Sequence, residues 1–209
     1  MSNRGHSSPE SVRAFAPYEA LAARLLPQAI GSDDGAHDIA HLLRVWKNVC
    51  AIQAVEGGDG ELLAAAVLLH DAVTVEKDSP LRAEASRLAA DAARMRLAAD
   101  GWPDARIEAV AHAIAAHSFS AGITPTTLEA RILQDADRLD AIGAVGVARC
   151  FYVAGRLGGS LYDPFDPEGR ARTLDDRRFA LDQTATGAAL ARERHERLMR
   201  FWREMLDEI

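Results

Sequence analysis

The feature that most constrains the fold of this chain is an apolar segment, ELLAAAVLLHDAV, over residues 61–73. Its side chains are apolar almost all round a helix, so the segment has no face suited to solvent. Such a helix must be buried at the centre of a bundle formed by other helices. Near its C-terminal end stand His70 and Asp71, an adjacent imidazole and carboxylate.

The composition also favours an all-α fold. The 209 residues are 48% hydrophobic and 6% aromatic, with many alanines and few β-branched runs. Helices dominate in chains of this kind. Hydrophobic periodicity, with capping residues and prolines, predicts helices over residues 18–26, 37–55, 61–73, 81–100, 104–118, 127–159 and 185–209.

The length suits one domain with a large core. We expect a flexible tail over residues 1–15, since these residues are polar, and a single domain over residues 16–209. The core of that domain covers about residues 33–160, and a C-terminal loop and helix occupy residues 161–209.

The charge distribution narrows the range of partners. The formal net charge is -7 and no basic stripe is present, so we expect no long nucleic acid as a partner. A small phosphorylated molecule remains compatible, because a bound cation and a few local cations can reverse the field in a cleft. No apolar run approaches the ~18 residues of a membrane span, and Cys50 and Cys150 suit small buried positions. We therefore expect a cytoplasmic protein without membrane attachment, as a monomer or homodimer.

Two further residues extend the His70-Asp71 pair into a metal-ligand pattern. His41 lies upstream and Asp137 lies downstream, which gives the order H…HD…D. Taken singly, His41 suits a structural histidine and Asp137 a solvated helix face. Taken together, two imidazoles and two carboxylates suit a divalent ion such as Mn, Fe, Co, Ni or Zn, and Mg less readily.

Three motifs carry a family resemblance. DDGAHDIAHLLRVW at residues 33–46, AAVLLHDAV at residues 65–73 and ILQDADRLDAIGAVGVAR at residues 132–149 resemble the HD superfamily of metal-dependent phosphohydrolases. The resemblance covers roughly residues 33–160 and is strongest to small, single-domain bacterial members.

This resemblance implies an HD-domain helical bundle with a C-terminal helical extension. It implies His41, His70, Asp71 and Asp137 as ligands of one divalent metal ion, and hydrolysis of a phosphoester or phosphoanhydride. The ion would lower the pKa of a bound water and polarise a phosphoryl oxygen. Relatives that act on nucleotides make a nucleotide the expected substrate, with nucleoside triphosphate pyrophosphohydrolysis as one form of the reaction.

Three residues are candidates for catalysis. Asp71 would combine this role with metal binding. His37 precedes His41 by four residues and would share its helix face, close to the bound water or a phosphate. Glu76 is a candidate acid for the leaving group. Solvent-facing positions are the alternative for His37 and Glu76.

Lys77 and Arg82 are candidates for phosphate binding. Both stand near the predicted start of a helix, where the backbone N–H groups and the helix dipole would also attract an anion. Solvated positions on the surface explain these two cations equally well.

His112, His117 and Asp140 complete the candidates for substrate contact. The two histidines lie five residues apart, a helical rotation of about 140°, so both reach one site only if the helix ends between them. For them we favour phosphate contact over a second metal. Asp140 follows Asp137 at i+3 and would anchor a neighbouring arginine or a metal-bound water.

Two alternatives stay open. His37-Asp38-Ile39-Ala40-His41 imitates the HExxH motif of zinc proteases, although Asp is shorter than the Glu base and the remaining motifs stay unexplained. A metal- and nucleotide-binding module without turnover would need the same ligands as an enzyme. The segment between LDD and the final helix is shorter than in related chains, which would make the site more open.

Overall fold

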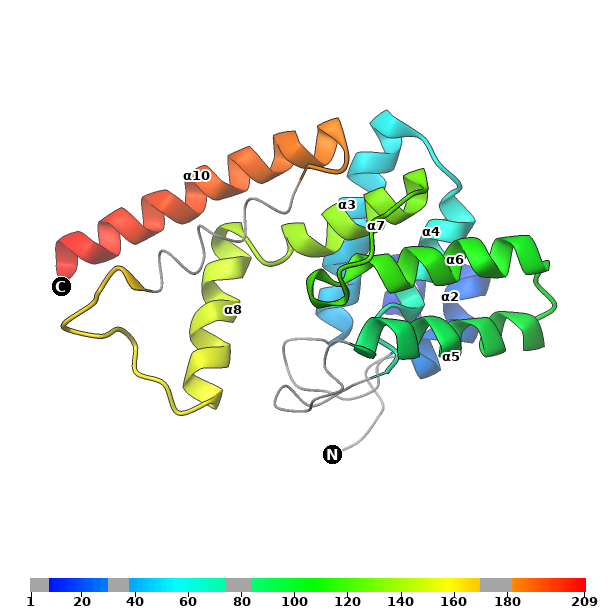
Figure 1. The fold of residues 1–209 in the computed structure, drawn as a ribbon, viewed down its shortest axis with the longest axis horizontal. Helices are drawn as coiled ribbons and strands as arrows, with labels where there is room; N and C mark the ends of the chain where they lie inside the picture. Colours follow the sequence, from blue (N-terminus) through cyan, green and yellow to red (C-terminus); the bar gives the residue numbers. More distant parts are fainter. Residues whose placement is uncertain (1–7, 30–37, 74–83, 170–181) are drawn as a thin grey trace.

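The computed structural model describes residues 8–29, 38–73, 84–169 and 182–209. These residues form helices and contain no named strand, which confirms the all-α fold (Figure 1). Two 3-10 turns, η1 (Leu26–Gln28) and η3 (Phe119–Ala121), connect longer helices. The α-helices are α1 (Pro9–Arg13), α2 (Glu19–Leu25), α3 (Ile39–Glu56), α4 (Gly60–Leu69), α5 (Ala85–Ala99), α6 (Asp104–His117), α7 (Leu128–Leu139), α8 (Gly143–Arg156) and α10 (Ala185–Glu208).

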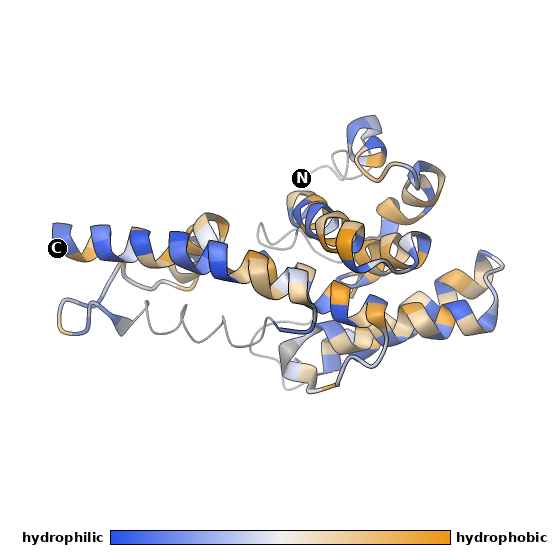
Figure 2. Ribbon diagram, turned by 90° about the horizontal axis from the view of Figure 1, so that it is seen from above, coloured by the Kyte–Doolittle hydropathy of each residue, from blue (hydrophilic) through white to orange (hydrophobic). Residues whose placement is uncertain are grey.

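Helix α4 lies at the centre of the bundle, as its apolar sequence predicts. Nine of its ten residues are buried, and it packs against α2, α3, α6 and α7. Figure 2 shows strongly hydrophobic residues on the helices of the bundle, whereas the C-terminal part of α10 is largely hydrophilic. Asp59 caps its first turn by accepting hydrogen bonds from two backbone N–H groups. The buried helix therefore delivers His70, its C-terminal cap, to the interior of the protein.

The folded domain includes residues near the N-terminus whose polar sequence predicts a tail. The hydroxyl of Ser8 caps α1, and the fully buried Phe15 stacks on Trp46 of α3 with ring centroids 5.3 Å apart. Tyr18 meets the same indole edge-on at 6.0 Å. Residues 8–15 thus contain a helix and the buried Ser11 and Phe15, which differs from the flexible tail predicted for them, because one aromatic side chain finds a partner in the bundle.

The segment predicted as one helix over residues 127–159 is two helices. Helix α7 starts after Thr127, which caps it, and ends at Leu139, and α8 starts at Gly143. Gly143 has φ +71°, a left-handed conformation that side chains with a Cβ rarely adopt. The turn over residues 140–142 brings the start of α8 close to α3 and α10.

Helices α8 and α10 form an extension beside the bundle (Figure 1). They pack on each other through Phe151 and Trp202, whose rings stack at 6.2 Å. The start of α10 is attached to α7, because the buried Asp135 carboxylate accepts hydrogen bonds from the Thr184 N–H and hydroxyl, both at 2.8 Å. This confirms the predicted C-terminal helical extension. Within the described ranges, no helix combines the length and the apolar character that crossing a membrane requires.

We predict that Gly143→Ala destabilises the protein by about 1–2 kcal/mol, the cost of a left-handed conformation for a residue with a Cβ. The added Cβ would also lie 3.1 Å from Cβ of Arg194. Urea unfolding measures the change. The control is Gly155→Ala in the same helix, where a Cβ meets nothing within 4 Å; it should be neutral or stabilise by up to about 1 kcal/mol. Equal effects of the two variants would contradict the explanation.

Candidate metal centre

Three helices bring the four candidate ligands together, and a fourth helix places His117 beside them. His41 lies in the first turn of α3, His70 caps the end of α4, and Asp71 follows it directly. Asp137 lies in the last turn of α7, and His117 is the last residue of α6. The C-terminal ends of three helices therefore meet at this point, and their dipoles favour a positive charge.

The metal-binding atoms of these residues converge. The Nε2 atoms of His41 and His70 are 3.3 Å apart. Asp71 Oδ2 lies 3.6 Å from His41 Nε2 and 3.5 Å from His70 Nε2. Asp137 Oδ1 lies 3.4 Å and 3.8 Å from the same two nitrogens. The four residues that the sequence pattern predicts as ligands thus share one small space.

The opposite ring nitrogen of each histidine has an acceptor of its own. His70 Nδ1 lies 2.8 Å from the Val67 carbonyl oxygen, to which it donates. His41 Nδ1 donates to the buried Asp140 carboxylate, also at 2.8 Å. A proton held at Nδ1 leaves the Nε2 lone pair for a metal ion, which is the usual arrangement behind a metal-bound imidazole.

The local charges favour a cation at the centre. Burial alone would lower the pKa of His41, but hydrogen bonds with Asp137 and Asp140 and the charge of Asp71 raise it to about 9. Burial alone would raise the pKa of Asp137, but His41 and the other imidazoles hold it well below its usual range. The cluster thus stabilises positive charge between the carboxylates.

The donor set and its spacing fit a divalent metal ion. Bonds of about 2.0–2.2 Å to nitrogen and oxygen place neighbouring ligand atoms about 2.8–3.6 Å apart in octahedral or tetrahedral coordination. The separations of 3.3–3.8 Å among the imidazole and carboxylate atoms lie within this range or a few tenths of an ångström above it. Even without Asp137, one ligand atom from each of His41, His70 and Asp71 lies within 4.8 Å of the other two, close enough to bind one metal ion.

The centre is open on its carboxylate side. The side chains of His41 and His70 are at most 1% exposed, whereas those of Asp71 and Asp137 are 29% and 24% exposed. The imidazoles therefore form the floor of the site, and a substrate would approach past the carboxylates.

Asp140 lies behind His41. Its carboxylate accepts hydrogen bonds from His41 Nδ1, from Arg44 Nε at 2.6 Å and from Arg149 Nη1 at 2.8 Å. These bonds hold the pKa of Asp140 below its usual value, although its burial opposes them. The expected anchoring of neighbouring arginines is therefore present. The predicted contact of Asp140 with substrate stays a prediction; the Asp140 side chain is 1% exposed, and its oxygens already accept hydrogen bonds from protein groups.

His117 belongs to the cluster and His112 does not. The His117 ring meets His70 edge-on at 4.9 Å, and its Nε2 lies 4.0 Å from Asp71 Oδ1. His112 Nε2 instead accepts a hydrogen bond from the Thr126 N–H at 3.0 Å. Because α6 continues through both histidines, the helical rotation between them separates their directions.

The remaining candidates, His37, Glu76, Lys77 and Arg82, lie outside the described residues. The start of α3 nevertheless argues against the zinc-protease alternative. Asp38 has extended backbone angles and caps the helix, because its side chain accepts a hydrogen bond from the His41 N–H at 2.9 Å. The HExxH motif requires a helix through all five of its positions, and here the second position lies before the helix.

The sequence predicts a neighbouring arginine for Asp140 but does not identify which arginines surround it. Arg44 follows His41 by three residues on the same face of α3, and this spacing is a signal that was available. Arg149 and Arg194 come from α8 and α10, and only the turn after α7 brings them near. Asn48 joins α3 to α7 by donating to the Ala136 carbonyl oxygen at 2.9 Å.

A helical bundle with two imidazoles and two carboxylates at its centre defines the class as an HD-type domain. A family model for the HD domain matches residues 38–142, and the chain belongs to this family. It is similar to the uncharacterized protein YpgQ of Bacillus subtilis, with 32% identity over 190 residues that cover 87% of this chain and 89% of YpgQ.

Solved structures agree with this assignment. The structure of Bacillus subtilis YpgQ in complex with ADP has a TM-score of 0.68 at 32% identity and covers 89% of this chain and 95% of that chain. An HD-superfamily hydrolase of Bacillus thuringiensis has a TM-score of 0.66 at 25% identity, with 95% and 96% covered. A predicted HD-superfamily hydrolase from an uncultured Thermotogales bacterium has a TM-score of 0.56 at 29% identity, with 95% and 89% covered.

We predict that Asp140→Asn weakens metal binding by about 10- to 100-fold, the usual effect of changing a residue that orients a metal-bound imidazole. The amide keeps the shape of the carboxylate but loses the charge that fixes the His41 ring. Equilibrium dialysis with Mn²⁺ or Co²⁺ measures the affinity. Asp91→Asn on the surface of α5 is the control and should bind like the wild type; an unchanged affinity in Asp140→Asn would remove the positioning role.

We predict that the metal-free protein loses stability as the pH rises from about 6.5 to about 9. His41 has a folded pKa of about 9 against a reference value of 6.5. The folded state therefore holds this proton more tightly, so the contribution is complete below pH 6.5 and disappears as the pH passes through 9. Urea unfolding at several pH values measures it. In His41→Gln the decrease should be smaller, and an equal decrease would show that another group is responsible.

Proposed function

We propose that this protein is a metal-dependent phosphohydrolase that acts on a nucleotide or a similar small phosphate ester or anhydride. The observation that carries the proposal is the convergence of two buried imidazoles and two partly exposed carboxylates in one space. When bound there, a divalent ion supplies a Lewis acid that lowers the pKa of water and polarises a phosphoryl oxygen.

The residues of the centre have different roles in binding the ion and the attacking water. His41 and His70 would hold the ion through Nε2, and Asp71 and Asp137 would each hold it through a carboxylate oxygen. Asp71 also presents its second oxygen, Oδ1, toward His117, where it can orient the attacking water. Because His117 Nδ1 donates to the Ile114 carbonyl and burial lowers the His117 pKa, its neutral form offers Nε2 as an acceptor. His117 therefore suits an attacking water better than a phosphate oxygen.

A nucleotide is the substrate class that we favour, with nucleoside triphosphate pyrophosphohydrolysis as the first reaction to test. The ADP complex of YpgQ supports this choice, since YpgQ covers most of this chain at 32% identity. In this proposal Glu76 is the acid for the leaving group, and Lys77 and Arg82 bind the phosphates of the substrate. His37 remains a candidate for contact with the water or a phosphate.

A panel of nucleotides and phosphoesters, assayed with Mn²⁺, Co²⁺ and Mg²⁺, tests the proposal. We expect release of orthophosphate or pyrophosphate that depends on the metal. Asp71→Ala should lose bound metal and turnover together, by more than the roughly 10- to 100-fold cost of altering an outer residue. Asp91→Ala removes an exposed carboxylate from α5 and should keep both properties.

Two results would contradict the proposal. Full metal occupancy in Asp71→Ala would remove Asp71 from the ligand set. Tight nucleotide binding without release of phosphate or pyrophosphate from any compound would instead favour a binding module that has no turnover.

A further inference from the structure

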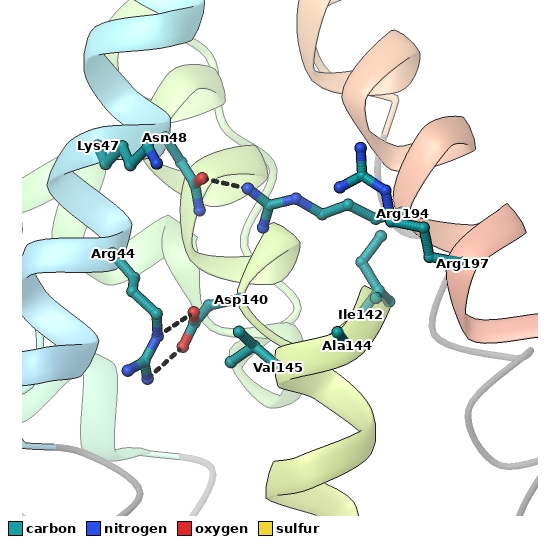
Figure 3. Close-up of a pocket in the computed structure, with 10 residues that line it drawn as sticks. Arg44, Lys47, Asn48, Asp140, Ile142, Ala144, Val145, Arg194 and Arg197 are labelled. Carbon is teal, nitrogen blue, oxygen red and sulfur yellow. Dashed lines mark hydrogen bonds and ion pairs between the residues drawn. The ribbon is translucent and has the colours of Figure 1, made fainter. Parts of the chain in front are cut away.

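A second cavity, with both charged and apolar lining residues, lies on the other side of Asp140 from the metal centre. It has a volume of about 230 Å³, is partly open to solvent and is lined by residues of α3, of the start of α8 and of α10. Figure 3 shows Arg194 reaching from α10 toward Asn48 of α3, with Arg44 and Asp140 nearby. None of the four metal-ligand candidates lines this cavity.

The lining is strongly cationic in a chain whose net charge is -7. Four cations line it, and one carboxylate, Asp140, opposes them. That carboxylate is already shared by His41, Arg44 and Arg149. The cationic lining residues are Arg44, Lys47, Arg194 and Arg197.

Several of these cations have donors to spare. Arg44 uses Nε and Nη2 on Asp140, which leaves its Nη1 for another acceptor. Arg194 donates to two neutral oxygens, the Leu139 carbonyl and Asn48 Oδ1, both at 2.6 Å. Lys47 is exposed and has no ion pair within the described part of the chain. Arg197 has one loose ion pair, with Glu193 at 3.6 Å, and both side chains are more than half exposed.

Among the described residues, the Arg194 guanidinium donates to neutral oxygens. Burial lowers the pKa of Arg194 and the charge of Arg197 lowers it further, while the charges of Asp140 and Glu193 oppose both effects. A partly buried guanidinium with neutral acceptors is stabilised when an anion approaches it.

The start of α8 adds backbone donors to the same cavity. Gly143, Ala144 and Val145 form the first turn of this 14-residue helix and line the cavity. Because these residues lie in the first turn, their backbone N–H groups have no carbonyl acceptor within the helix. The N-cap residue makes no side-chain hydrogen bond to them, and the first turn contains no acidic residue. Small residues there let an anion approach the backbone, and the helix dipole favours negative charge.

We propose that this cavity binds a phosphate or diphosphate group at a site separate from the metal centre. Planar guanidinium groups and a lysine are the side chains that recognise phosphate oxygens. The volume is below the roughly 300–1,000 Å³ of pockets that enclose a drug-sized ligand. The cavity therefore takes an inorganic anion or the phosphates of a nucleotide whose remainder stays outside.

This site does not depend on the proposed hydrolase activity. Asp140 lies between the cavity and His41, and it contacts the imidazole at Nδ1, whereas the metal ligands converge on Nε2. A phosphate held by Arg44 and Arg194 would thus lie behind the His41 ring. Binding can be measured without metal and without turnover.

Titration calorimetry at low ionic strength, with inorganic pyrophosphate as the probe and metal removed beforehand, tests the site. We expect Lys47→Gln/Arg197→Gln to bind at least about tenfold more weakly, because it loses two hydrogen-bonding cations. Both residues are exposed, so the variant should fold normally, which circular dichroism checks. Arg200→Gln/Arg203→Gln removes two exposed cations from the same helix α10 without altering the cavity lining and should change the affinity less than about twofold.

Asp71→Asn separates this site from the metal centre and should bind pyrophosphate like the wild type. The proposal fails if pyrophosphate does not bind the wild type at millimolar concentration. It also fails if the Lys47/Arg197 variant binds normally, or if Asp71→Asn loses binding. A parallel titration with ADP identifies the source of the phosphate, by comparing Asp71→Asn with the same variant that also carries Lys47→Gln/Arg197→Gln. Weaker binding of both probes on adding the Lys47/Arg197 changes supports nucleotide phosphates, and weaker binding of pyrophosphate alone supports an inorganic anion.

Discussion

The hydrogen bond from His41 Nδ1 to Asp140 is the interaction on which the rest of the site depends. Both side chains are 1% exposed, and the bond is 2.8 Å long. A carboxylate buried this deeply is tolerated only with charged partners, and Arg44 and Arg149 supply them. The bond fixes the His41 ring and directs its Nε2 toward His70. Without it, the two imidazoles would lose their common orientation, and Asp140 would be a buried charge with fewer partners.

Three aspartates at the end of α7 have three different roles. Asp135 and Asp137 are two residues apart, a rotation of about 200°, so they leave the helix on opposite sides. Asp135 faces the start of α10 and holds Thr184, whereas Asp137 faces the imidazoles. Asp140 lies just beyond the last turn and contacts His41 from behind. The turn after α7 therefore connects the extension, the candidate metal centre and the cationic cavity.

Much of the fold was predictable because it follows from local patterns. The apolar sequence of α4 requires burial, and Pro103 and Gly101 mark helix limits that the structure contains. The break between α7 and α8 was not predicted, since the residues there are compatible with a continuous helix and only tertiary contacts end it. Burial of Phe15 was missed for a related reason, because its partner Trp46 is 31 positions away in the sequence.

Some residues of the candidate site were likewise predictable from the sequence, whereas the roles of others required the fold. The H…HD…D pattern predicted residues that the structure brings together, because resemblance to a known family carries spatial information that one sequence lacks. The role of Asp140 required the fold, since its three partners come from α3 and α8. His112 and His117 looked equivalent in the sequence, and only the continuation of α6 through both separates them.

We propose that His41, His70, Asp71 and Asp137 together bind one divalent ion. Anomalous diffraction from a crystal equilibrated with Mn²⁺ would locate that ion. We expect one strong peak bounded by the two Nε2 atoms and by one oxygen of each aspartate. A peak coordinated by other residues, or no peak at this position at saturating Mn²⁺, would contradict it.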